Sequence, residues 1–181
     1  MRNKFILFIA LLAMMVSCSP RTNVIKVDIP KRPAGQESVI GLTAAPIDTV
    51  RVGFIGLGMR GSHAVRRLTK VPDCKVTAIC DVEYDRVEKS ANDLAKKGLP
   101  QPEMYGGEVD SWKKLCESEN VDLVYICTDW KNHAHMALYA MECGKHVAIE
   151  VPAATTLEEC WALVDMSEKT RKHCMMLENC I

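Results

Sequence analysis

The chain alternates short apolar runs with longer amphipathic stretches from about residue 49 to its end. The apolar runs are rich in valine and isoleucine, which is typical of strands buried on both faces. The stretches between them carry charged residues on one side and stop at glycine or proline, which is typical of surface helices. We expect strands at residues 50–55, 75–80, 103–105, 121–128, 146–150 and 174–177, and helices at 62–70, 83–97, from 110, at 133–143 and at 157–172.

Such alternation predicts right-handed crossovers and a parallel sheet. The fold class is therefore α/β, a Rossmann-type doubly wound sheet with the strand order 3-2-1-4-5-6. Polar residues recur where the expected strands end, at residues 56–61, Asp81, residues 128–133, Glu150 and Asn179. Ligands of these sheets bind beyond the carboxyl ends of the strands, so the sequence predicts a binding site there.

The first strand runs into a G-x-G-x-x-G pattern at Gly56, Gly58 and Gly61. In a dinucleotide site the first glycine permits the turn, the second lets the backbone approach the pyrophosphate, and the third lets helix and strand pack closely. Asp81 ends the second strand 20 residues after Gly61, where the fingerprint places a ribose ligand. The alternative role is an acid that stabilises the turn. Asp81 would repel a 2′-phosphate and Val82 offers no arginine, so we expect NAD rather than NADP.

The N-terminus has the pattern of an export signal. Arg2 and Lys4 precede an unbroken apolar run at residues 5–16, which is short for a membrane span. Small residues then lead to Cys18, and this end resembles a bacterial lipoprotein signal. Residues 1–17 would be removed and Cys18 lipidated, which anchors an exported protein to a membrane. An ordinary secretory signal or an uncleaved anchor are the alternatives.

Residues 18–48 are interrupted by four prolines and two glycines, and we expect a flexible tether there. A short strand at residues 24–27 is the alternative for part of it. Residues 49–181 then form the nucleotide-binding domain.

Charge and cysteine usage exclude several classes of function. Lysine plus arginine number 23, equal to aspartate plus glutamate, and we expect no nucleic-acid partner. The nine cysteines include no C-x-x-C pair. Cys80, Cys127 and Cys174 lie in apolar runs, where cysteine acts as a small hydrophobic residue. His133 and His135 face different sides of a helix, and no zinc-ligand spacing occurs, so we expect no metal site.

Three segments resemble one clan of oxidoreductases, that of glucose-fructose oxidoreductase and inositol dehydrogenase. The clan has a strand ending T-P-x-x-x-H, then G-K-H-V, then E-K-P. Residues 128–133 here read T-D-W-K-N-H, residues 144–147 read G-K-H-V, and residues 150–152 read E-V-P. The clan lysine, which helps to move the substrate hydroxyl proton, is Val151 here. Valine carries no proton, which argues against ordinary alcohol dehydrogenation by that route.

The variants E-V-P and W-x-x-H, with G-M-R-G and the lipoprotein-like start, resemble the family-109 glycoside hydrolases. Members of that family are α-N-acetylgalactosaminidases that keep NAD bound. The resemblance covers about residues 49–181. It implies NAD contacts from Met59, Arg60, Asp81, Trp130, Lys131, Asn132, His133, Glu150, Val151 and Asn179, beside Gly56, Gly58, Gly61 and Thr128 of the motifs.

The resemblance also implies an unusual hydrolysis. The sugar is transiently oxidised at C3, loses its C2 proton and expels the C1 substituent. Water then adds and C3 is reduced again, so no pair of catalytic carboxylates is required. The alternatives are an NAD-dependent sugar or cyclitol dehydrogenase and a non-catalytic NAD-binding module.

Several of these residues have structural alternatives. His133 would contact cofactor or substrate, or bond to the backbone at a helix start. Glu150 would contact the cofactor, or cap the turn before Pro152. Trp130 would stack on the cofactor, or cover the sheet end. In the clan a second, substrate-binding domain follows the sixth strand, and the family's catalytic residues would lie beyond Ile181. We therefore expect this chain to be the N-terminal part of an enzyme acting on amino-sugar glycans.

Overall fold

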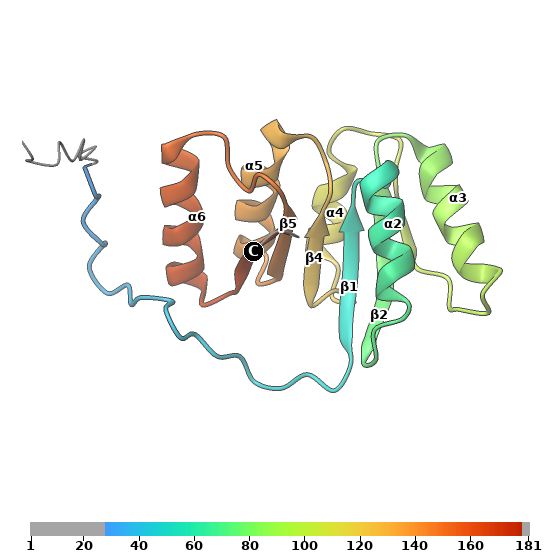
Figure 1. The fold of residues 1–181 in the computed structure, drawn as a ribbon, viewed down its shortest axis with the longest axis horizontal. Helices are drawn as coiled ribbons and strands as arrows, with labels where there is room; N and C mark the ends of the chain where they lie inside the picture. Colours follow the sequence, from blue (N-terminus) through green and yellow to red (C-terminus); the bar gives the residue numbers. More distant parts are fainter. Residues whose placement is uncertain (1–27, 179–181) are drawn as a thin grey trace, which may run out of the picture. The chain divides into compact units, whose positions relative to one another are not determined.

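The computed structural model describes residues 28–178, and the fold in them is a parallel sheet with helices on both faces (Figure 1). The strands are β1 (Val50–Ile55), β2 (Cys74–Asp81), β3 (Glu103–Gly106), β4 (Leu123–Ile126), β5 (His146–Glu150) and β6 (Cys174–Leu177). The helices are α2 (Met59–Leu68), α3 (Tyr84–Ala95), α4 (Ser111–Glu117), α5 (Trp130–Glu142) and α6 (Leu157–Thr170).

The strand order is β3-β2-β1-β4-β5-β6, and every adjacent pair is parallel. This confirms the doubly wound Rossmann-type sheet expected from the sequence. The order reverses between β1 and β4, so the carboxyl ends of these two strands mark the switch point where such folds bind ligands.

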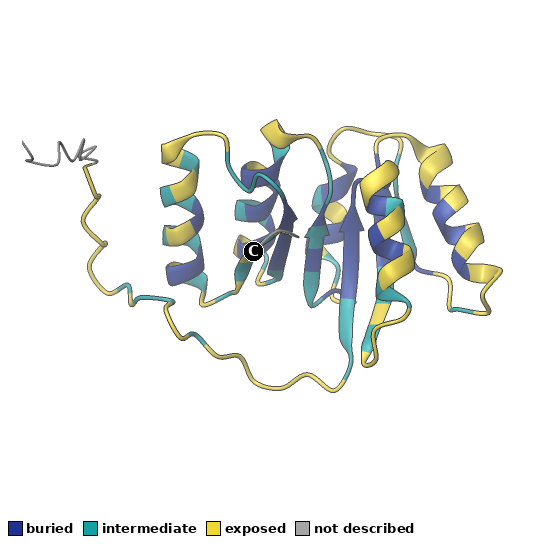
Figure 2. Ribbon diagram, in the orientation of Figure 1, coloured by how far each residue is buried: buried dark blue, intermediate teal, exposed yellow. Residues whose placement is uncertain are grey.

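Two apolar layers hold the helices to the sheet. On one face α2 and α3 pack on β1 and β2, through residues such as Val65, Leu94 and Phe54. On the other face α4, α5 and α6 pack on the sheet, with Leu115 and Met141 fully buried. Figure 2 shows that the strands are largely buried while the outer sides of the helices are exposed, as expected for strands covered on both faces.

Helices α2 and α5 begin three residues before the positions predicted from apolar periodicity. Gly58 and Asp129 precede them in extended conformation and act as their N-caps. The first residues of these helices, Met59 and Trp130, are 82% and 64% exposed, so they contribute no apolar face. The periodic signal therefore starts one turn late. The observed β4, Leu123–Ile126, is shorter than the strand expected at residues 121–128, because the residues at both ends of that range lie in loops.

Thr156 is the N-cap of α6. Its side chain accepts a hydrogen bond from the backbone N–H of Glu159, and the Glu159 carboxylate accepts one from the backbone N–H of Thr156. This capping box satisfies two N–H groups that the helix leaves unpaired. The helix then ends at Arg171, in left-handed conformation with φ 55°.

The segment before β1 contains no helix or strand in residues 28–49, but part of it contacts α6. Arg32 forms a two-pronged ion pair with the buried Glu168, with distances of 2.8 and 3.0 Å. The Arg171 guanidinium donates to the carbonyl oxygens of Glu37 and Ser38. Residues 32–38 are therefore held against this helix. The signal at 1–17, Cys18, residues 24–27 and Asn179 lie outside the described residues.

Cys80 is buried in β2, while Cys127, just after β4, and Cys174, at the start of β6, are partly buried. Burial raises the pKa of the Cys80 and Cys127 thiols to about 12, and that of Cys174 to about 11. Such thiols stay protonated at neutral pH and are poor nucleophiles. No helix in residues 28–178 is long and apolar enough to cross a bilayer.

Candidate functional site

The glycine-rich turn joins β1 to α2 at the carboxyl edge of the sheet. Gly56 has a φ of +88°, and a Cβ there would lie 2.5 Å from the carbonyl oxygen of Cys127. Gly61 has no room either, because a Cβ would overlap the carbonyl oxygen of Gly56. A Cβ at Gly58 would meet nothing within 4 Å. The first and third glycines are thus required by packing, while Gly58 leaves an open space in front of the helix.

That open space suits a phosphate group. Helix α2 begins directly after Gly58 and has no acidic residue in its first turn. The N–H groups of its first turn and its positive dipole end face the space, which is the arrangement that binds a pyrophosphate. The three glycines therefore do what the dinucleotide fingerprint requires of them.

Asp81 ends β2 next to this turn, and its carboxylate is almost buried. One oxygen accepts a hydrogen bond from the backbone N–H of Leu57, at 2.6 Å. The other accepts from the backbone N–H of Glu83 at 2.9 Å, and an Nη atom of Arg86 lies 3.3 Å from it. Asp81 thus connects the glycine-rich turn to the start of α3, the alternative role considered from the sequence. It also borders the cavity described next, so a ribose can approach it there.

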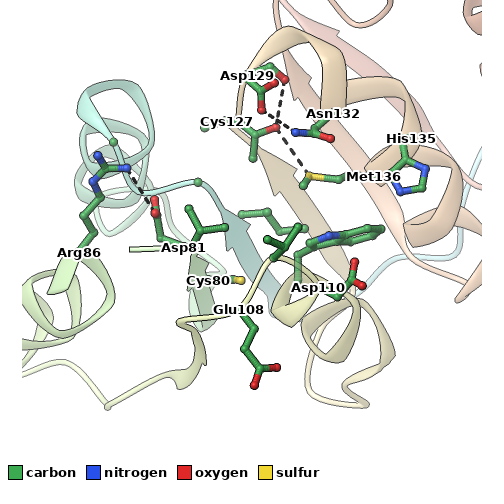
Figure 3. A pocket seen from close by; sticks show the side chains of 17 residues that line it. Cys80, Asp81, Arg86, Glu108, Asp110, Cys127, Asp129, Asn132, His135 and Met136 are labelled. Atoms are coloured by element: carbon green, nitrogen blue, oxygen red, sulfur yellow. Dashed lines mark hydrogen bonds and ion pairs between the residues drawn. The ribbon is translucent and has the colours of Figure 1, made fainter. Parts of the chain in front are cut away.

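A cavity of about 400 Å³ opens at this edge of the sheet (Figure 3). Its walls come from the loops after β1, β2, β3 and β4, and include Gly58, Asp81, Thr128 and Asn132. The side chains of Trp112 and Met136 add apolar surface. Such a cavity, apolar with a few polar groups at its rim, suits a purine base and its ribose.

Residues missed from the sequence also line this cavity. They are Arg86, Glu108, Val109, Asp110, Trp112, His135 and Met136. Trp112 and Met136 looked like core residues because they occupy the apolar sides of their helices. The sequence carries no signal that these sides extend to the rim of the sheet.

His133 is fully buried in the first turn of α5, beside the loop that follows β4. Its Nδ1 lies 2.8 Å from the carbonyl oxygen of Pro152, and its Nε2 lies 3.1 Å from that of Thr128. The imidazole thus bridges the loops that follow β4 and β5. This matches the backbone-bonding alternative for His133. The side chain thereby holds both loops in place at the carboxyl edge of the sheet.

Glu150 ends β5 and contacts residues from two other elements. One of its oxygens lies 3.0 Å from Nε of Arg60 in α2. The other accepts a hydrogen bond from the Tyr125 hydroxyl of β4, at 3.1 Å. Burial, with Cys127 and Glu150 nearby, raises the pKa of Tyr125 to about 12. Tyr125 was not predicted from the sequence, because it lies within an apolar strand.

The sequence model of one protein family matches residues 50–178, and that family is described as "Oxidoreductase family, NAD-binding Rossmann fold". The chain belongs to this family. It is also 59% identical over 157 residues to glycosyl hydrolase family 109 protein 1 of Bacteroides fragilis (strain YCH46). That alignment covers 87% of this chain and 34% of the relative. The chain thus spans about a third of the length of the curated relatives it matches.

Solved structures agree with this membership. An NAD-binding protein from Listeria innocua has a TM-score of 0.60 and 29% identity, over 71% of this chain and 35% of that one. A 3-ketoreductase from Actinomadura kijaniata, solved with NADP and TDP-benzene, has a TM-score of 0.61 and 27% identity, over 71% and 37%. The NAD-binding fold expected from the sequence is confirmed, and NAD is the cofactor of this domain.

Within this oxidoreductase domain, the remaining predicted contacts differ in accessibility. Met59, Trp130 and Lys131 are exposed at the starts of α2 and α5. Asn132 donates a hydrogen bond from its side-chain amide to the Asp129 carboxylate, at 2.7 Å. Val151 is partly buried in the loop after β5. All of them lie at the carboxyl edge, which is the cofactor side of the fold.

Proposed function

We propose that this chain is the NAD-binding part of a glycosidase that removes α-linked N-acetylgalactosamine by transient oxidation at C3 of the sugar. The observation that carries the proposal is Val151. It occupies the position at the end of β5 where the resembled dehydrogenases have a proton-transferring lysine, and it carries no proton. The similarity to family-109 glycosyl hydrolases supports the same choice.

The residues present fit NAD. A side chain at position 58 would fill the space that the pyrophosphate needs, and glycine leaves it open. The Asp81 carboxylate borders a cavity large enough for a nucleoside and is suited to a ribose diol. NAD supplies reversible hydride acceptance when it is bound. The chain itself would hold the dinucleotide in one fixed position across the carboxyl ends of the strands.

Two groups of residues would fix the position of the dinucleotide. The start of α2 and Asp81 would hold the pyrophosphate and the ribose of the adenosine half. Arg60 and Glu150, paired at 3.0 Å, lie farther along the edge toward β5, on the nicotinamide side. Because the Glu150 carboxylate already contacts two donors, we assign it to positioning rather than to proton transfer.

A chimera tests the proposal. Residues 49–181 would replace the matching third of the Bacteroides fragilis relative, after that relative has been shown to release p-nitrophenol from p-nitrophenyl α-N-acetylgalactosaminide. We expect the chimera to hydrolyse this substrate without added NAD⁺, because the cofactor stays bound. The matched chimera with Gly58→Val should fold and be inactive. An inactive chimera that still binds NAD would overturn the proposal in favour of a non-catalytic module.

A sugar or cyclitol dehydrogenase is the second candidate, favoured by likeness to oxidoreductases such as the Actinomadura 3-ketoreductase. The same assay separates the two candidates. A glycosidase of this kind returns the hydride and accumulates no NADH, whereas a dehydrogenase produces NADH in step with substrate. NADH formation without release of p-nitrophenol would therefore favour the dehydrogenase.

We also propose that the protein is exported and lipid-anchored through Cys18. The support is the apolar run at residues 5–16 ending in Ser17-Cys18. Cells fed labelled palmitate should label the wild-type protein and not the Cys18→Ala variant. Equal labelling of both proteins would refute lipidation at Cys18.

A further inference from the structure

A second hollow lies between two helices, outside the nucleotide cavity. Helices α2 and α3 cover the same face of the sheet, and a groove of about 480 Å³ lies between them (Figure 1). The buried side chains of Val65 and Leu94 form its apolar floor. Of the described residues, none lines both this groove and the nucleotide cavity. The groove is therefore a feature separate from the cofactor site.

The groove carries an excess of positive charge. Four cationic residues line it, against one carboxylate, and they are Arg66 of α2 and Lys89, Lys96 and Lys97 of α3 and its end. The carboxylate is that of Asp93, which is paired with Lys96 at 3.3 Å. Arg66 and Lys89 form no ion pair with any residue in 28–178. Their charges are therefore available to a ligand in the groove.

Ser90 offers a buried hydrogen-bond donor to the same groove. The residue is only 7% exposed and lines the groove from α3. Its hydroxyl has no hydrogen-bond partner among residues 28–178, although buried polar groups normally have one. The Ser62 hydroxyl on the opposite wall differs, because it already donates to the carbonyl oxygen of Met59 at 3.2 Å. A ligand oxygen in the groove would accept a hydrogen bond from Ser90.

These groups suit a tetrahedral oxyanion. A sulfate or phosphate group has acceptor oxygens that point in several directions, and the groove has donors on two walls. The Arg66 guanidinium comes from α2, and the Lys89 ammonium and the Ser90 hydroxyl come from α3. Asp85 and Glu88, two further acids of α3, do not line the groove. The donor set thus favours a compact anion with several oxygens.

We propose that the groove between α2 and α3 binds a sulfate or phosphate group, held by Arg66, Lys89 and Ser90. The group comes either as the free ion or as the ester of a sugar, and both present the same oxygens. A water molecule takes about 30 Å³ in the liquid, so a free ion of a few atoms leaves most of the groove to a larger molecule. The volume therefore favours the ester. The site depends neither on NAD binding nor on the glycosidase activity proposed above.

Titration calorimetry on the full chain tests this site at low ionic strength, because salt screens exposed charges. The probes are inorganic sulfate, inorganic phosphate and galactose 6-sulfate, with galactose as the uncharged control. The variants are Arg66→Gln, Lys89→Gln and Ser90→Ala. Arg67→Gln is the matched control, because Arg67 is also an exposed arginine of α2 but does not line the groove.

We expect galactose 6-sulfate to bind and galactose not to bind. Arg66→Gln and Lys89→Gln should each weaken binding by about tenfold, through the loss of a charged hydrogen bond. Ser90→Ala should weaken it by about threefold or more without changing the charge, which attraction to a positive surface alone would not produce. This variant should fold, because it removes a buried hydroxyl that has no partner. Arg67→Gln should bind as the wild type does.

The probes also distinguish the sources of the anion. Tighter binding of galactose 6-sulfate than of inorganic sulfate would identify a sugar ester as the ligand, and equal binding would identify the free ion. NAD titrations with and without the bound ester should agree, since the two sites share no lining residue.

Three results would overturn the proposal. The first is that none of the three anions binds. The second is equal weakening by Arg66→Gln and Arg67→Gln, which would indicate a general attraction of anions to α2. The third is competition between the ester and NAD, which would place the anion in the nucleotide cavity instead of the groove.

Discussion

Substituting the two glycines that flank the start of α2 separates folding from cofactor binding. In Gly61→Ala the new Cβ would overlap the carbonyl oxygen of Gly56 and lie 2.8 Å from its carbon and 3.3 Å from Cβ of Cys127. Ordinary carbon contacts are about 3.5–4.0 Å, so α2 must move away from β1 by about an ångström. In Gly58→Ala the Cβ meets nothing within 4 Å, and the backbone angles of φ −61° and ψ −162° suit any residue.

The size of the effect at Gly61 follows from two opposing terms. Overpacking costs typically about 1–3 kcal/mol, and the upper end applies because backbone atoms cannot rotate away. Alanine recovers about 1 kcal/mol through its higher helix propensity. The net loss is about 2 kcal/mol, which corresponds to a fall in Tm of about 4–8 °C for a chain of this size.

Urea unfolding and calorimetry with NAD measure the two effects independently. Gly61→Ala should lose stability and also bind NAD more weakly, because the helix start moves. Gly58→Ala should change stability by only a few tenths of a kcal/mol, as for other weak N-caps, yet lose at least about tenfold in NAD affinity. Equal stability of Gly61→Ala and the wild type, or unchanged NAD affinity of Gly58→Ala, would refute this account of the turn.

Four further substitutions test the contacts around the sheet. The paired Arg51 guanidinium lowers the pKa of Asp122, so its stabilisation is present above about pH 4 and lost as the pH falls through the lowered pKa. Asp122→Asn should cost about 1 kcal/mol at pH 7, with solvent screening of the half-exposed arginine included. Urea unfolding should show this difference shrink as the pH falls below about 4. Glu150→Gln should weaken NAD binding by about tenfold in calorimetry. Tyr125→Phe removes one neutral hydrogen bond and should change NAD affinity less than about threefold. Equal NAD affinities of the two variants would contradict the positioning role of Glu150. His133→Ala removes the imidazole that contacts the carbonyl oxygens of Pro152 and Thr128 and opens a cavity, so urea unfolding should show a loss of about 2–4 kcal/mol. A near-zero change would mean that the loops after β4 and β5 support themselves.

The fold was predictable because its signals are local. Each strand is a continuous apolar run, and the helices between them end at residues that terminate helices, such as Gly98 and Gly144. A parallel sheet with right-handed crossovers then leaves few possible strand orders. The glycine-rich turn was predictable for the same reason, since Gly56, Gly58 and Gly61 lie within six residues.

The contacts that complete the site were not predictable, because they join distant residues. Arg60 and Glu150 are 90 positions apart, and both are ordinary charged residues in the sequence. Arg32 and Glu168 are 136 positions apart, and Arg32 lies in the segment whose composition indicates a tether. Pairing of this kind depends on where the crossovers place each helix end, which composition and periodicity do not encode.

The two ends of the candidate site differ in what they say about chemistry. The glycine-rich turn and Asp81 satisfy the needs of any NAD-binding protein, so they cannot separate a hydrolase from a dehydrogenase. The end of the site near β5 can separate them. There the pKa values of Tyr125 and Cys127 are both raised to about 12, so both side chains stay protonated. Glu150 already accepts from Tyr125 and pairs with Arg60, and Val151 has no proton to give. None of these four groups is available as a base, so the proposed glycosidase would need other groups for proton transfer to or from its sugar substrate. We therefore expect them in the two-thirds of the relatives' length that this chain does not span.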